Sequence, residues 1–261
     1  MRSISSDREV KLFVQGSYAN NTNVRLNSDA DIAVVLESTF RPKYRPGLLG
    51  KNYGFSDSAD NIQQFKNDVQ QALIKRFGRD VERKNKSIKV HGNSYRVDAD
   101  TVPCMRYRDY SDDYSLNPNN YVSAIFIQPD EGEGIINYPE QHIINGRTKN
   151  AETHLYFKKM VRIIKRMRYL MQDYQYASAS GISSFGLESL LWNIPNSLYL
   201  ENSQYRLVYM FHCILSYLNV NKELLLLYKE ANGIKPLCPT QADFGNYLSF
   251  LGDLSIFYEY E

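Results

Sequence analysis

Two short apolar runs near the start of the chain are joined by a glycine–serine turn and a pair of aspartates. The first run ends at Gly16-Ser17, and Asp29-x-Asp31 opens the second run, from Ile32 to Leu36. Side chains alternate between the two faces of a strand, so Asp29 and Asp31 are expected on the same side of a sheet, at its rim. Two ionised carboxylates so close repel each other unless a divalent cation lies between them and a bound phosphate. The pattern predicts a metal site for phosphoryl or nucleotidyl transfer.

A third carboxylate is expected close to this pair. Two strand-like runs within residues 87–102 flank Gly92-Asn93, which suits a two-residue hairpin turn. Asp98 and Asp100 fall on one face of the second of these strands. We expect this strand to lie beside the one that carries Asp31, so that Asp100, or alternatively Asp98, completes a site of three carboxylates.

These parts match the needs of nucleotidyl transfer. Attack on an α-phosphate requires charge neutralisation and an in-line nucleophile, and two Mg²⁺ ions about 4 Å apart provide both. One ion would hold the donor triphosphate, and the other would lower the pKa of the attacking hydroxyl. A Gly-Ser turn offers backbone N–H groups and a hydroxyl to a triphosphate. Each part alone is more often an ordinary turn or a solvated carboxylate, so the prediction rests on their combination.

The pattern predicts an α/β protein with two domains. Over residues 1–150 we expect a twisted mixed sheet, a helix from Asp60 to Phe77, and a long loop over 40–60. Pro103 is expected to end its strand. Beyond it, residues 105–150 read as loop apart from a strand at 122–127.

Residues 151–261 are predicted to form a helical lobe that closes the active-site cleft. The first helix of this lobe has an apolar stripe and an opposite basic side, which either faces phosphates or is simply solvated. The expected helices cover residues 154–171, 185–193, 202–218, 221–231 and 240–257.

Composition narrows the setting of the protein. The chain has 261 residues, of which 43% are hydrophobic and 23% charged, as in an ordinary globular protein. The net charge of +2 gives no reason to expect a surface that binds nucleic acid generally, although it allows a local basic groove. The three cysteines are widely spaced, which indicates reduced thiols. No apolar run reaches the roughly 20 residues of a membrane span, and the N-terminus is too polar for a signal peptide. A cytoplasmic protein is expected.

The motifs together resemble a known family. Gly-Ser, Asp-x-Asp and a later strand aspartate are similar to the polymerase-β-like nucleotidyltransferases. More narrowly, the stretch from Gln15 to Arg25, Ser28-Asp-Ala-Asp31 and Asp100-Thr-Val-Pro103 resemble the bacterial CD-NTases of anti-phage signalling, within their clade E. The CD-NTases are relatives of cyclic GMP-AMP synthase. Stretches 161–166 and 182–188 are similar to the helical lobe of that family.

The resemblance implies roles for individual residues. Asp29 and Asp31 would bind both metal ions, and Asp100 would bind the ion on the acceptor side. The remaining residues implied in the site would bind the triphosphate, and these are Gly16, Ser17, Lys165, Ser183 and Ser184. The chain departs from the family pattern because fifteen residues precede Gly16, where relatives usually carry a long helix. If the chain is truncated there, a less rigid link between the lobes is expected.

The resemblance also implies a reaction and its partners. Donor and acceptor nucleoside triphosphates would be joined into a cyclic di- or oligonucleotide with release of pyrophosphate, and the enzyme would need two Mg²⁺ ions, with Mn²⁺ as a substitute. A monomer without membrane contact is expected, and the resemblance allows for an activating RNA or protein. Two alternatives stay open: transfer of nucleotides to RNA or a small molecule, and a non-catalytic nucleotide- or RNA-binding module of the same fold.

Overall fold

The computed structural model describes residues 8–24, 29–56, 61–201 and 206–259. The chain divides into two compact units. Unit 1 comprises Met1–Tyr18 and Ser28–Glu140, and unit 2 comprises Ala19–Asn27 and Gln141–Glu261. Residues 19–24, shortly after the Gly-Ser turn, therefore belong to the same unit as the C-terminal half of the chain.

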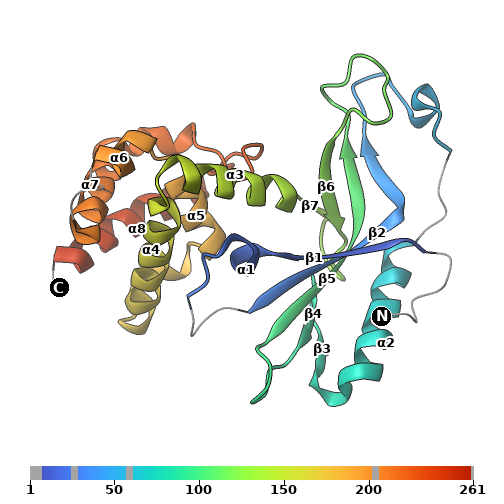
Figure 1. Cartoon of the computed structure of the whole chain (residues 1–261), viewed down its shortest axis with the longest axis horizontal. Helices are drawn as coiled ribbons and strands as arrows, with labels where there is room; N and C mark the ends of the chain where they lie inside the picture. Colours follow the sequence, from blue (N-terminus) through green and yellow to red (C-terminus); the bar gives the residue numbers. More distant parts are fainter. Residues whose placement is uncertain (1–7, 25–28, 57–60, 202–205, 260–261) are drawn as a thin grey trace. The chain divides into compact units, whose positions relative to one another are not determined.

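Unit 1 is built on a mixed sheet with the strand order β1-β2-β5-β4-β3 (Figure 1). In addition, β6 pairs with the later part of β5, and β7 pairs with β6. The sheet and the mostly helical remainder of the chain agree with the predicted fold class. The strand bounds are β1 Val10–Gln15, β2 Ala30–Lys43, β3 Val81–Arg83, β4 Ile88–Val90, β5 Ala99–Asp109, β6 Val122–Ile127 and β7 Ile135–Asn137.

The strands β2 and β5 are parallel neighbours, as expected for the strands that carry Asp31 and Asp100. Both are longer than predicted. Pro103 does not end β5, and β2 extends through Pro42 into the expected loop. At Pro103 the strand β5 has passed its last pairing with β4 and has not reached its first with β6, and at Pro42 β2 has passed its pairing with β1. A proline is tolerated where a strand lacks a second neighbour.

The predicted hairpin turn at Gly92-Asn93 is also wrong. β4 and β5 do pair antiparallel, but the register sets Val90 opposite Ala99, so residues 91–98 form a longer connection. Within it Asn93 bridges to Arg96.

Helix α2, Ile62–Phe77, covers one face of the sheet. The side chain of Asn61 caps its start by accepting from the backbone N–H groups of residues 63 and 64, and Gly78 caps its end. Asp60, the predicted cap, lies outside the described residues. Apolar side chains of β2 alternate as expected, with Val34 packed under α2 and Val35 in a separate cluster on the other face.

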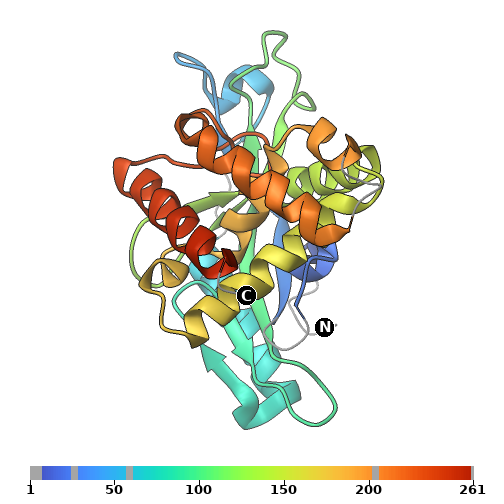
Figure 2. The same cartoon turned by 90° about the vertical axis from the view of Figure 1, so that its left-hand side faces the viewer.

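Unit 2 is a helical bundle around one apolar core (Figure 2). The helices α4, α5 and α8 surround this core, and α8 contacts both α4 and α7. Two predictions fail here: α3 occupies a stretch expected to be loop, and residues 221–231 form only a short 3₁₀ turn. The bounds are α1 Gly16–Asn20, shared with unit 1, α3 Pro139–Glu152, α4 Tyr156–Asp173, α5 Ser184–Trp192, α6 Asn196–Glu201, α7 Leu207–Val220 and α8 Gln241–Glu259.

The predicted domain boundary at residue 150 falls inside α3. Across the described residues, no helix combines the length and apolarity that a bilayer crossing demands.

Candidate active site

The carboxylates of unit 1 meet at the start of two parallel strands. Asp31 on β2 and Asp100 on β5 are paired in register, and Asp29 lies just before β2. The backbone N–H of Ala30 donates to the carbonyl of Asp98 at 3.0 Å, which fixes this register where the strands begin. The structure therefore brings Asp29, Asp31 and Asp100 to one edge of the sheet.

The surroundings of Asp31 are electrostatically unfavourable for a bare carboxylate. Its pKa rises to about 6, first because of burial and then because of the charges of Asp100 and Asp29. A divalent cation would offset this repulsion, and oxygen ligands of this kind are those that Mg²⁺ prefers. The donor set therefore fits a divalent metal ion.

The Gly-Ser turn lies directly against Asp31. Gly16 has a φ of +64°, and a Cβ atom at this position would overlap Oδ2 of Asp31 and lie 3.1 Å from its Cγ. Gly16 is therefore required twice, for its backbone conformation and for the close approach. Ser17 follows it at the start of α1. The turn and the Asp31 carboxylate thus lie next to each other, at the end of the sheet where β2 begins.

A lysine absent from the predicted site contacts two of the acidic residues. Lys89 Nζ lies 3.1 Å from Asp29 Oδ2 and 2.7 Å from Asp98 Oδ2, and these carboxylates raise its pKa. The sequence places Lys89 on a predicted strand, but the predicted two-residue turn would have set it opposite Arg96. The observed register pairs it with Asp100 instead. Ser87 Oγ donates to Asp100 Oδ1 at 3.2 Å.

Asp98 is held in the connection that precedes β5. Its side chain pairs with Lys89, and it also accepts a hydrogen bond from the backbone N–H of Gly92 at 2.5 Å. Its position outside the strand and its two partners favour Asp100 as the third carboxylate. Within the described ranges, no three His, Cys, Asp or Glu side chains converge tightly enough to hold a metal ion as they stand.

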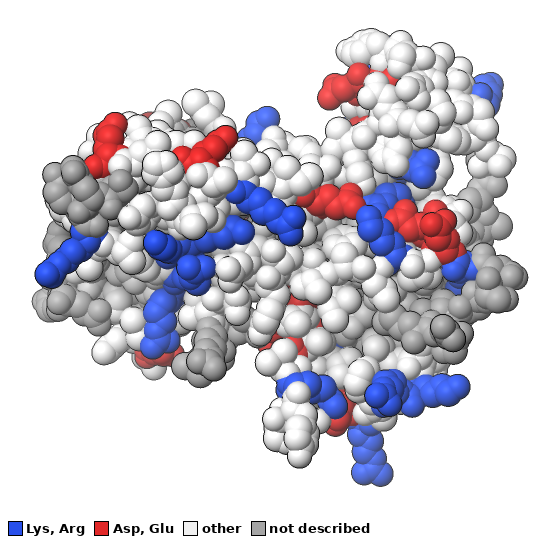
Figure 3. All heavy atoms as spheres, viewed as in Figure 1, with Lys and Arg blue, Asp and Glu red and all other residues white. Residues whose placement is uncertain are grey.

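The other predicted nucleotide ligands belong to unit 2. Ser183 caps α5 by accepting from the backbone N–H of Gly186 at 2.9 Å, and Ser184 Oγ accepts from Arg168 at 3.2 Å. Lys165 is 2% exposed and forms an ion pair with Glu188 at 3.1 Å. Their contact with nucleotide stays a prediction. Figure 3 shows several Lys and Arg side chains over the α3–α4 region, in line with the expected basic helix side.

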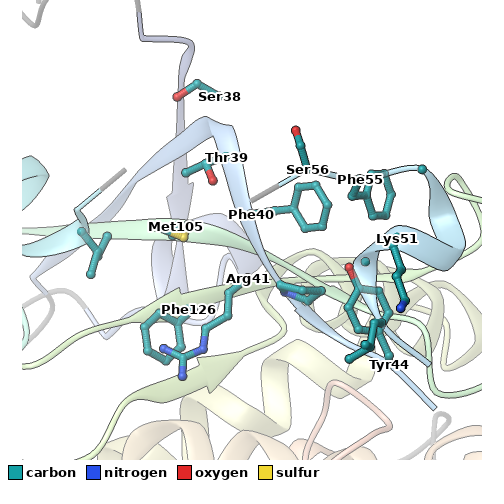
Figure 4. Close-up of a pocket in the computed structure, with 15 residues that line it drawn as sticks. Ser38, Thr39, Phe40, Arg41, Tyr44, Lys51, Phe55, Ser56, Met105 and Phe126 are labelled. Atoms are coloured by element: carbon teal, nitrogen blue, oxygen red, sulfur yellow. The ribbon is translucent and has the colours of Figure 1, made fainter. Parts of the chain in front are cut away.

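A cavity of about 1130 Å³ lies in unit 1 where β2 continues beyond its bulge (Figure 4). Arg41 lines it and stacks over the ring of Phe126, with 4.2 Å from its guanidinium carbon to the ring centroid. The lining starts at Ser38, well along β2 from Asp31, and includes none of the three carboxylates. The cavity is therefore separate from the carboxylate site.

Two family models match the chain, the nucleotidyltransferase domain over residues 1–114 and the cGAS/DncV-like nucleotidyltransferase C-terminal helical domain over residues 144–259. The cyclic GMP-AMP synthase CdnE03 of Staphylococcus schleiferi is 48% identical over 100% of this chain and 80% of its own length. The cyclic dipyrimidine nucleotide synthase CdnE of Cecembia lonarensis is 39% identical over 79% of this chain and 71% of its own.

Solved structures agree with these matches. The Rhodothermus marinus CdnE c-UMP-AMP synthase, bound to Apcpp and Upnpp, has a TM-score of 0.84 at 27% identity and covers 98% of this chain and 86% of that one. The Elizabethkingia meningoseptica CdnE cyclic dinucleotide synthase, with GTP and Apcpp, has a TM-score of 0.75 at 31% identity and covers 97% and 87%. The resemblance inferred from the motifs is confirmed, and the chain belongs to the cGAS/DncV-like nucleotidyltransferases, the CD-NTase family of enzymes.

Proposed function

We propose that this enzyme joins two nucleoside triphosphates into a cyclic dinucleotide and releases pyrophosphate at each of two transfer steps. The observation that carries the proposal is the in-register pair of Asp31 and Asp100 with Gly16 packed against Asp31. Relatives that match most of the chain are named as cyclic nucleotide synthases. Each transfer forms a bond from a hydroxyl oxygen to an α-phosphorus and breaks the bond from that phosphorus to the pyrophosphate leaving group.

Enzymes of this family generally use divalent metal ions. We assign Asp29, Asp31 and Asp100 to a pair of Mg²⁺ ions, which Mn²⁺ could replace. When bound, these ions would neutralise the triphosphate and acidify the attacking hydroxyl. The turn at Gly16 and Ser17 would orient the triphosphate through backbone N–H groups and the serine hydroxyl. Since little covalent chemistry falls to the protein, positioning and electrostatics supply the catalysis.

The base preference differs among the relatives. The names of those discussed above include a GMP-AMP, a dipyrimidine and a UMP-AMP product. The relative that matches this chain over its full length makes cyclic GMP-AMP by its name, which supports ATP and GTP as the first pair to test. A role in anti-phage signalling in the bacterial cytoplasm, a monomeric state and an activating RNA or protein remain predictions from the family resemblance.

The experiment is incubation of the chain with the four nucleoside triphosphates, singly and in pairs, with Mg²⁺ or Mn²⁺. The products are treated with phosphatase and identified by mass spectrometry, because a cyclic product has no terminal phosphate to remove. A phosphatase-resistant dinucleotide supports the proposal. Only linear products would favour transfer to another acceptor, and the absence of pyrophosphate under every condition would favour a binding module.

A further inference from the structure

A buried polar cluster in unit 2 surrounds Glu188 of α5, which is 1% exposed. Its Oε1 accepts from Nε2 of His142 at 2.9 Å. Its Oε2 accepts from Nζ of Lys165 at 3.1 Å and from Oγ1 of Thr22 at 2.7 Å. The carboxylate therefore has three donors, and the hydrogen bonds and charges from them lower its pKa to about 2 although burial alone would raise it.

The ammonium of Lys165 is equally occupied. Its Nζ lies 3.1 Å from Glu188 Oε2, 3.1 Å from Thr22 Oγ1 and 3.3 Å from the carbonyl oxygen of Thr22. A lysine ammonium has three N–H donors, so these three acceptors use them all. A phosphate could bind this group only by displacing one of them.

Three consecutive residues of the segment after the Gly-Ser turn are held by this bundle. The Asn20 amide nitrogen lies 3.3 Å from Nδ1 of His142, the carbonyl of Asn21 accepts from Arg162 at 2.7 Å, and Thr22 binds Glu188. Asn20 and Thr22 are fully buried. Asn21 has a φ of +53°, in the left-handed region that asparagine tolerates better than most residues.

The helix α3 is shaped to fit this segment. A Cβ atom at Gly146 would lie 2.9 Å from Oδ1 of Asn20, closer than side chains pack. Removing one member of such a buried set destabilises a fold, but replacing the whole set with well-packed apolar residues is often neutral, so stability alone does not account for it. What it does provide is a single position for residues 20–22.

We propose that Glu188, Lys165, His142 and Thr22 act as a clamp that positions residues 20–22, shortly after the Gly16-Ser17 turn, for triphosphate binding and transfer. The turn and Asp29 belong to unit 1, whereas residues 20–22 belong to unit 2, so along the chain the clamped residues lie between two parts of the candidate site. The clamp residues are positioning residues, and this role rests on the proposed function. The clamp also accounts for the asparagines at positions 20 and 21, which it holds through a side chain and a backbone carbonyl.

The test compares two buried threonines of unit 2. Thr22→Val removes the hydroxyl that bridges Glu188 and Lys165, and Thr153→Val is the matched control. Thr153 is also fully buried. Its hydroxyl donates to the carbonyl of Lys149 at 2.8 Å and accepts the backbone N–H of Phe157 at 3.1 Å, and neither partner is a clamp residue. We expect Thr22→Val to lower kcat/KM for pyrophosphate release about tenfold or more, the size of a lost hydrogen bond to a charged group. Thr22→Ser should keep kcat/KM near that of the wild type. Thr153→Val should keep it within about twofold of the wild type, even if its Tm falls as much as that of Thr22→Val.

Hydrogen exchange provides a readout that does not depend on turnover. Peptides that cover residues 14–24 should exchange faster in Thr22→Val than in the wild type. In Thr153→Val their exchange rate should equal that of the wild type. Equal exchange in the two variants, or equal kcat/KM in them, would overturn the clamp. A wild-type chain that releases no pyrophosphate would refute the proposed function alone. The clamp would then be tested by hydrogen exchange and by the affinity for a non-hydrolysable triphosphate in the presence of Mn²⁺. We expect this affinity to be about tenfold weaker in Thr22→Val than in the wild type.

Glu188→Gln separates the clamp from direct phosphate binding by Lys165. The substitution keeps the volume of the side chain and releases Lys165 from its carboxylate. If Lys165 binds phosphate directly, the affinity for the non-hydrolysable triphosphate should hold or increase. If the clamp holds, the affinity should fall and hydrogen exchange over residues 14–24 should increase. An affinity equal to that of the wild type, or higher, would overturn the clamp.

Discussion

Gly16→Ala tests whether the backbone of the Gly-Ser turn must lie against Asp31. The added methyl group has two costs. The positive φ of +64° disfavours any L side chain by about 1–2 kcal/mol. The Cβ atom would also overlap Oδ2 of Asp31, so that the carboxylate has to move away from its place beside Asp100.

Gly54→Ala is the matched control for the backbone cost. Gly54 has a φ of +76°, and a Cβ atom there would meet no atom within 4 Å. Both variants should lose about 2–8 °C of Tm, because each 1 kcal/mol shifts Tm by about 2–4 °C in a chain of about this size. Only Gly16→Ala should lose activity, by about 100-fold in kcat/KM, because a displacement of about 1 Å at a reacting centre has that effect.

Circular dichroism gives the two Tm values, and a coupled pyrophosphate assay gives the rates. If Gly16→Ala keeps kcat/KM within about threefold of Gly54→Ala, the close approach of the turn to Asp31 has no part in the reaction.

Further predictions concern three kinds of titratable side chain: the aspartates of the candidate site, Glu188 and Cys104. Asp100→Asn should abolish pyrophosphate release while triphosphate binding measured by calorimetry stays near the wild type, whereas Asp98→Asn should retain turnover; the reverse result would make Asp98 the third ligand. The pKa of Glu188 is about 2 in the folded chain, below its ordinary 4.5, so its charge stabilises unit 2 above pH 4.5 and this contribution disappears as the pH falls to about 2. Glu188→Gln should therefore be less stable than the wild type in urea at pH 7, and the gap should close between pH 4.5 and 2; a gap independent of pH would contradict the ion pair. Burial raises the pKa of the Cys104 thiol far above its usual range, so iodoacetamide should modify Cys104 only after unfolding, as mass spectrometry would show.

The sequence was most informative where one strand pattern carries both the core and the chemistry. The alternation that buries Val34 and Val35 on opposite faces of β2 also fixes the side on which Asp31 projects, so the neighbouring aspartates of β2 and β5 were predictable. Strand ends were not. Pro42 and Pro103 look like strand breakers, yet each lies where its strand has only one neighbour, and that depends on pairings far apart in the chain.

Side-chain partners were the least predictable part of the site. Lys165 has the position of a phosphate ligand by resemblance, and its pairing with Glu188 and Thr22 depends on how residues 20–22 pack in unit 2. Lys89 is likewise a member of a predicted strand, but only the β4–β5 register sets it beside the acidic residues. Helix α3 was missed because the turn-forming residues of 112–134 led to a loop prediction for the whole of 105–150. The helix begins at Pro139, where proline is well tolerated, and its Gly146 makes room for Asn20.

The central claim is that Asp31 and Asp100 hold a divalent cation that transfer requires. The most direct measurement is Mn²⁺ binding by electron paramagnetic resonance in the presence of a non-hydrolysable triphosphate, on the wild type and on Asp31→Asn. The same two proteins are then assayed for pyrophosphate release. We predict Mn²⁺ binding and turnover in the wild type and the loss of both in Asp31→Asn. Mn²⁺ binding and turnover in Asp31→Asn equal to those of the wild type would contradict the assignment.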